Sequence, residues 1–128
     1  MNRMFSFVAK VSFVLCVVTI SLLSLSPSES VPQVGGFDKV VHFLSYFFLS
    51  LSFWLGFNKV KAAWFVLVLL VLFGVCIEIL QSFVPGRMMS FMDAVANALG
   101  VLAGFWMFMA MFNVMFKAML KNKMGNLK

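Results

Sequence analysis

Polar side chains that could bind or transform a small molecule occur in three short stretches of an otherwise apolar sequence. They are Asp38, His42 and Tyr46 in the first stretch, Glu78, Gln81 and Arg87 in the second, and Asp93 and Asn97 in the third. In the first and third stretches these residues are four positions apart, and such residues lie on one face of a helix. The spacing therefore predicts polar stripes on helices.

The residue types indicate acid–base chemistry on an anionic molecule. His42 is the natural general base, oriented by Asp38 or Asp93, and Glu78 is a candidate general acid. Arg87 could hold an anionic headgroup or a developing oxyanion. We therefore assign candidate catalytic roles to His42, Glu78 and Asp93, and candidate ligand-binding roles to Asp38, Tyr46, Gln81, Arg87 and Asn97.

Other common kinds of site have little support in the sequence. No serine or cysteine stands out as a nucleophile, so a hydrolase would have to activate water. No residues have the H-E-x-x-H spacing of a zinc site, and we expect no metal and no other cofactor. Cys16 and Cys76 both lie in apolar runs, where thiols behave as small hydrophobic groups, and we expect no disulfide between them.

The composition predicts which elements position these groups. Of the 128 residues, 63% are hydrophobic and only 11% are charged, whereas a soluble domain has roughly 25% charged residues. A span of the bilayer core needs about 20 apolar residues. Runs of this kind occur at about 5–25, 40–57, 62–84 and 94–116. We predict an all-α membrane protein, a single four-transmembrane-helix bundle over residues 1–128, with a basic, frayed tail at 117–128.

The first apolar run has an alternative interpretation. Arg3 and Lys10 precede it, and Ser24-Leu25-Ser26 resembles a signal-peptide cleavage site. Pro27 would be a poor residue to follow the cut. We therefore expect an anchored helix, with Lys10 extending toward the headgroups.

The basic residues predict the orientation of the bundle, because cytoplasmic loops are enriched in Lys and Arg. A cytoplasmic N-terminus leaves only Lys39 and Arg87 outside. It places inside Arg3, Lys10, Lys59, Lys61, Lys117, Lys121, Lys123 and Lys128. Both termini are then cytoplasmic. The net charge of +6 is distributed at the edges of apolar runs, which argues against a nucleic-acid partner.

The same orientation places the acidic residues, Glu29, Asp38, Glu78 and Asp93, on the outer side or in the outer part of a helix. Glu78 would lie about 25 Å along the helix from Lys61, roughly one turn below the outer boundary. An ionisable group at that depth is costly unless it is paired or hydrated. Arg87 is the nearest candidate partner, and protonated His42 is the second. A structural salt bridge and a functional site explain the group equally well.

The polar stretches resemble a known family. Residues 38–46 are similar to the D-K-x-x-H-x-x-x-Y segment of VanZ-like membrane proteins. Residues 78–87 resemble their E-x-x-Q-x-x-x-P-G-R segment, and residues 90–100 their D-x-x-A-N-x-x-G segment. The resemblance covers residues 38–104 and no polar position departs from it. It implies a bacterial membrane protein of a family named after a member linked to tolerance of glycopeptide antibiotics such as teicoplanin, and it implies no established reaction.

Some of these residues also have structural explanations. Asp38 could be an N-cap, and Ser90 with Asp93 fits a capping box. Asn97 would form an interhelical hydrogen bond. Gly100 and Gly104 indicate close packing against another helix of the chain, with homodimerisation as the second alternative.

The leading hypothesis is a polar pocket at the outer leaflet of the bacterial cytoplasmic membrane. It would bind, or act on, a lipid-linked envelope precursor or another cell-envelope molecule, with membrane lipids or a glycopeptide as further partners. The alternative is a non-enzymatic membrane scaffold or receptor whose polar cluster is structural. A proton-coupled transporter is a weaker third hypothesis, because paired broken helices are absent from the predicted pattern.

Overall fold

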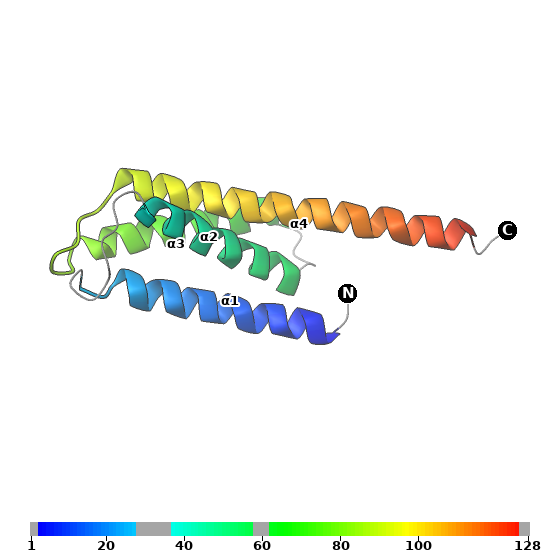
Figure 1. Ribbon diagram of the computed structural model, residues 1–128, viewed down its shortest axis with the longest axis horizontal. Coiled ribbons are helices and arrows are strands. Elements are labelled where there is room, and N and C mark those ends of the chain that lie inside the picture. The colour runs from blue at the N-terminus through cyan, green and yellow to red at the C-terminus, as the bar shows by residue number, and fades with distance from the viewer. Residues whose placement is uncertain (1–2, 28–36, 58–61, 126–128) are drawn as a thin grey trace.

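The computed structural model describes residues 3–27, 37–57 and 62–125. These residues form four helices that run alternately in opposite directions (Figure 1): α1 (Arg3–Ser24), α2 (Phe37–Gly56), α3 (Ala63–Gln81) and α4 (Phe91–Gly125). Each is long and apolar enough to cross a membrane. The prediction of an all-α bundle with four transmembrane helices is confirmed.

Helices α2 and α4 form the centre of the bundle, with α1 packed on α2 and α3 packed on α4. The contact between α2 and α4 is close because Gly100 and Gly104 present no side chain to α2. A Cβ atom at Gly100 would overlap the carbonyl oxygen of Phe43, and one at Gly104 would overlap that of Phe47. This glycine face is therefore used within the chain, as expected, and a homodimer through it would have to displace α2.

The core lies along this central pair of helices. Leu49 of α2 and Val101 of α4 have no exposed surface, and Tyr46 and Trp54 are nearly as buried. The Ser50 hydroxyl donates a hydrogen bond of 2.8 Å to the Val101 carbonyl. This hydrogen bond joins the two helices where their backbones are close.

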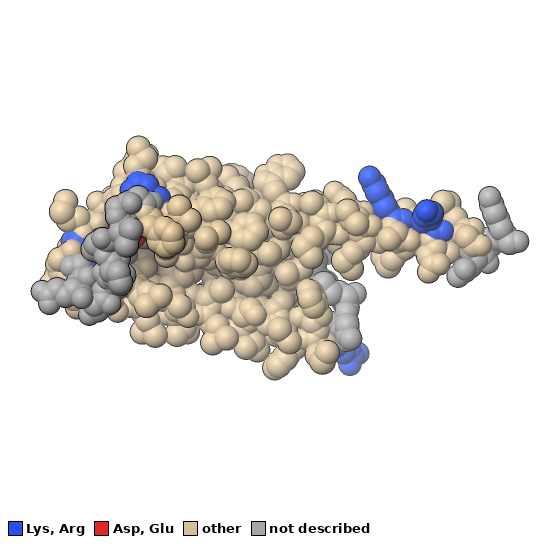
Figure 2. All heavy atoms as spheres, viewed as in Figure 1, with Lys and Arg blue, Asp and Glu red and all other residues tan. Residues whose placement is uncertain are grey.

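The bundle has two chemically different ends. At one end α1 and α3 finish and α2 and α4 begin, and we call this the polar end (Figure 1). The opposite, basic end carries Arg3 and the lysines of α4. Figure 2 shows the lysines as a blue group on the part of α4 that extends past the main body. At the basic end, Lys10 lies 5.1 Å above the Phe57 ring, and the Ser6 hydroxyl donates to the Gly56 carbonyl at 2.9 Å. Residues 58–61, with Lys59 and Lys61, are outside the described residues.

Helix α4 is longer than we predicted from its apolar run at about 94–116. Its 35 residues span about 52 Å, whereas the bilayer core is roughly 30 Å thick. The helix continues past the bundle to Gly125 (Figure 1), so the expectation of a frayed tail from residue 117 was wrong for the part described. The reason is local. Residues 117–124 consist mostly of Lys, Met, Leu and Ala, which favour helix, and this stretch contains no Gly or Pro.

The close contact between α2 and α4 can be tested with a single methyl group. We expect Gly100→Ala to lower the free energy of unfolding by about 1–3 kcal/mol, because a rigid backbone carbonyl occupies the space. Gly125→Ala is the matched control, since nothing lies within 4 Å of that position. Unfolding by SDS in mixed micelles, followed by circular dichroism, measures both. Equal stabilities of the two variants would contradict this packing.

Candidate functional site

The up-and-down topology brings all the candidate residues to the polar end. Asp38, His42 and Tyr46 lie in the first turns of α2, because α2 begins at Phe37, earlier than predicted. Glu78 and Gln81 lie in the last turn of α3. Asp93 and Asn97 lie in the first turns of α4, and Arg87 is in the connection before it.

His42 is the partner of the buried carboxyl group of Glu78. The imidazole Nδ1 lies 2.9 Å from the Asp38 carbonyl oxygen. Because a carbonyl can only accept, Nδ1 carries the hydrogen of this bond. The other ring nitrogen, Nε2, lies 3.3 Å from Glu78 Oε1, an ion-pair distance without hydrogen-bond geometry. Glu78 is only 1% exposed, so this contact compensates a carboxyl group that water cannot reach.

Arg87 does not occupy the position expected for it. Its Nε donates to the Ser26 carbonyl at 3.3 Å and its Nη2 donates to the Leu23 carbonyl at 3.2 Å. Leu23 is in the last turn of α1 and Ser26 lies just beyond it, where a helix leaves acceptors without partners. Arg87 therefore attaches α1 to the polar end. The expectation that it would be the first partner of Glu78 was wrong, and His42 has that role.

The start of α4 carries a capping arrangement that also includes Glu78. Ser90 Oγ accepts a hydrogen bond of 3.3 Å from the Asp93 N–H, as in a capping box. The Ser90 N–H donates to Glu78 Oε2 at 3.4 Å instead of to Asp93. The Asp93 side chain, 8% exposed, is thus free to pair with Lys39 at 3.4 Å. Lys39 is a contributor that the sequence analysis did not single out.

Asp38 is not an N-cap residue, since it is the second residue of α2. Its side chain is 47% exposed, and Oδ1 lies 3.5 Å from His42 Nδ1. The carboxylate therefore adds to the contact that the Asp38 carbonyl already makes with the same ring nitrogen. Asp38 orients the imidazole from one turn away.

Two neutral polar groups near the polar end are buried without hydrogen-bond partners among the described residues. They are the Tyr46 hydroxyl and the Asn97 amide, both of whose polar atoms are unpaired. The interhelical hydrogen bond predicted for Asn97 is therefore not formed within this part of the chain. Both side chains pack against Gly74 of α3, where a Cβ atom would lie 3.1 Å from each of them. An isolated glycine in the apolar run was the only sequence signal for this contact.

A small cavity of about 130 Å³ opens beside these groups. Helix α1, which the sequence motifs do not include, forms one wall with Thr19, Leu23 and Ser24. The polar residues that complete the lining are Asp38, His42, Ser45, Tyr46, Gln81 and Arg87. A larger groove of about 730 Å³ at the basic end is lined by apolar residues such as Phe5, Phe108 and Met115. Of these two spaces, only the smaller one is lined by groups that could bind a polar ligand.

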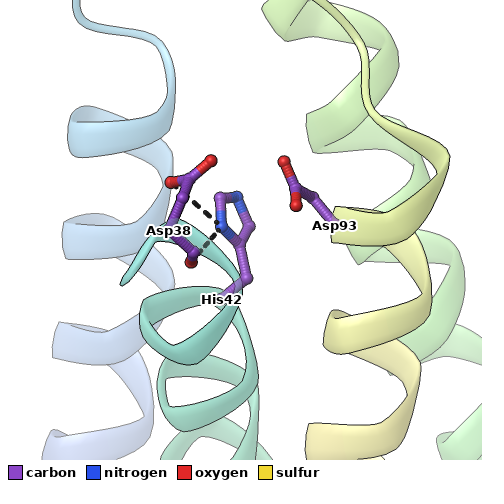
Figure 3. A group of neighbouring side chains, drawn as sticks. All are labelled: Asp38, His42 and Asp93. Carbon is purple, nitrogen blue, oxygen red and sulfur yellow. Dashed lines mark hydrogen bonds and ion pairs between the residues drawn. The ribbon is translucent and has the colours of Figure 1, made fainter. Parts of the chain in front are cut away.

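Asp38, His42 and Asp93 could also hold a metal ion. Figure 3 shows the two carboxylates on either side of the imidazole ring. One potential ligand atom from each residue lies within 4.8 Å of the others. These residues come from two helices, so no spacing along the sequence could have indicated the group.

Because the Asn97 amide is unpaired, we expect two substitutions of this residue to change the free energy of unfolding in opposite directions. Asn97→Leu should raise the free energy of unfolding by about 1–3 kcal/mol, because it replaces buried unpaired donors and acceptors with an apolar group of similar size. Asn97→Ala should lower it, because it leaves a cavity. SDS unfolding in mixed micelles measures both. If leucine destabilised the bundle as much as alanine, the amide would have a partner that this account lacks.

The comparison with known proteins agrees with this architecture. The VanZ/LLP1 family model matches residues 3–115, a range that includes α1, the segment with the alternative signal-peptide interpretation. No curated protein and no solved structure matches the chain. With four apolar helices long enough to span a bilayer and a family match over most of its length, the chain is a multi-pass membrane protein that belongs to the VanZ/LLP1 family.

Proposed function

We propose that the polar end binds the anionic headgroup of a lipid-linked or cell-envelope molecule at the outer leaflet of a bacterial cytoplasmic membrane. The observation that carries the proposal is the cavity of about 130 Å³ in which Arg87 and His42 meet Gln81. A guanidinium and neutral donors in one recess suit a phosphate or carboxylate. The Asp38 carboxylate also lines this recess, but it is 47% exposed and therefore screened by water.

The orientation of the bundle supports an outer-leaflet site. Arg3, Lys10, Lys117, Lys121 and Lys123 all belong to the basic end, and the positive-inside rule assigns such an end to the cytoplasm. The polar end then faces the exterior. Met88 is 87% exposed in the connection at the polar end, so Met88→Cys should react with an impermeant thiol reagent added outside the cells, in a background where Cys16 and Cys76 are serine.

The cavity's size favours a headgroup over a whole antibiotic. A volume of about 130 Å³ corresponds to about four water molecules at roughly 30 Å³ each. A phosphate group fits such a space, and a glycopeptide is far too large for it. The protein would thus contribute to glycopeptide tolerance by binding an envelope precursor. The apolar part of that precursor would remain in the bilayer.

Arg87 would recognise the headgroup while it holds α1. Its bonds to Leu23 and Ser26 use Nε and Nη2, and a guanidinium has further N–H donors in the same plane. Gln81, which is 3% exposed, supplies an amide to the same cavity. The oriented His42 ring beside Glu78 makes an acid–base step on the bound molecule the natural extension.

The contacts of Arg87 and Lys39 also favour a second candidate function, a non-enzymatic scaffold. Arg87 bonds to α1 carbonyls and Lys39 pairs with Asp93, so both cations have structural partners. A scaffold would need no ligand in the cavity. Ligand binding therefore separates the two functions.

We expect purified wild-type protein in neutral detergent to bind short-chain phosphatidic acid more tightly than phosphatidylcholine of the same chain length. Arg87→Gln should weaken phosphatidic acid binding at least about tenfold, because it removes charge-assisted hydrogen bonds. Microscale thermophoresis measures the affinities.

Two variants complete this experiment. Arg3→Gln removes an arginine at the basic end and should leave the affinity unchanged. Ser45→Leu fills the cavity without removing the Arg87 bonds to α1 and should weaken binding as Arg87→Gln does. Equal binding of both lipids, or full binding by Ser45→Leu, would favour the scaffold.

A further inference from the structure

The polar end contains more carboxyl groups than cationic groups that pair with them. Asp38, Glu78 and Asp93 meet around one imidazole. Among the described residues only the Lys39 ammonium forms an ion pair with any of them besides His42. Arg87 lines the neighbouring cavity, but its hydrogen bonds go to carbonyl groups. The two buried carboxyl groups, Glu78 and Asp93, require compensating positive charge, which a bound cation could supply.

The geometry around His42 suits a metal ligand. Because Nδ1 donates its hydrogen to the Asp38 carbonyl, the neutral ring has its lone pair on Nε2. A metal-binding histidine typically donates its other ring N–H to a carbonyl or a carboxylate in this way. The carboxylates of Asp38 and Asp93 lie on either side of the ring (Figure 3), and one oxygen of each lies within 4.8 Å of a ring nitrogen and of the other oxygen. Zinc binds nitrogen and oxygen at about 2.0–2.2 Å, so small side-chain movements would complete the coordination.

A buried carboxyl oxygen outside this group faces the second ring nitrogen of His42. Glu78 Oε1 has no hydrogen-bond partner among the described residues, and Glu78 is 1% exposed. It lies 3.3 Å from His42 Nε2. When Nδ1 carries the ring hydrogen, these two atoms are both acceptors. They approach each other favourably when Nε2 carries either a second ring proton or a metal ion, so a metal would take the place of that proton.

We propose that Asp38, His42 and Asp93 form a binding site for one divalent transition-metal ion, with Glu78 next to it. An imidazole combined with carboxylates favours zinc or manganese over magnesium, which binds mainly oxygen. The ion would bind where Lys39 now contacts Asp93, so the lysine competes with it. This site goes beyond the proposed headgroup function and does not depend on it.

Isothermal titration of the full-length, tag-free protein in detergent with ZnCl₂ or MnCl₂ tests the site. We expect one ion to bind per chain. Asp93→Asn and Asp38→Asn should each weaken binding at least about tenfold, because each removes a charged ligand. Lys39→Gln should strengthen binding, because it removes the competing ammonium. That gain distinguishes the site from a general loss of charge or of fold.

The controls make either result decisive. Replacement of Cys16 and Cys76 by serine should leave the affinity unchanged, which separates this site from binding to thiols. Asp38 is half-exposed, so Asp38→Asn should fold even if His42→Gln does not. The absence of saturable binding of both metals at millimolar concentration would overturn the site, as would unchanged affinity in both Asp variants. Phosphatidic acid binding by the same preparations shows separately whether the headgroup proposal holds.

Discussion

The arrangement of the polar end depends on one buried carboxyl group. Glu78 has almost no exposed surface, and a carboxyl group at that depth in a lipid-facing bundle must find partners within the protein. One oxygen faces His42 of α2, and the other accepts the N–H of Ser90 at the start of α4. Glu78 thereby connects three helices at one level and determines how their ends meet.

The close packing of α2 on α4 makes these contacts compatible with one another. Gly100 and Gly104 let the two backbones approach until a Cβ atom would no longer fit. This places the first turn of α2 beside that of α4, so that Lys39 reaches Asp93 and His42 lies between two carboxylates. The glycines carry no functional group, yet they fix the distances on which the site depends.

The sequence predicted the elements and the level of the site better than its contacts. Apolar length alone predicted four spans, and spacing along each helix predicted that polar groups such as His42 and Glu78 would meet at one end. The partners of Arg87 and Lys39 were not predicted, and neither was the lack of a partner for Asn97 among the described residues. They depend on how each helix is rotated about its axis, which tertiary packing determines. For the same reason the wall contributed by α1 had no sequence signal.

The coupling between His42 and Glu78 tests this account most directly. A double-mutant cycle with His42→Gln, Glu78→Gln and the double variant isolates their interaction in the free energy of unfolding, measured in mixed micelles. We expect a coupling of more than about 1 kcal/mol, since each residue is the main partner of the other. If the two changes were additive to within about 0.3 kcal/mol, the buried carboxyl group would not depend on the imidazole, and the account would be contradicted.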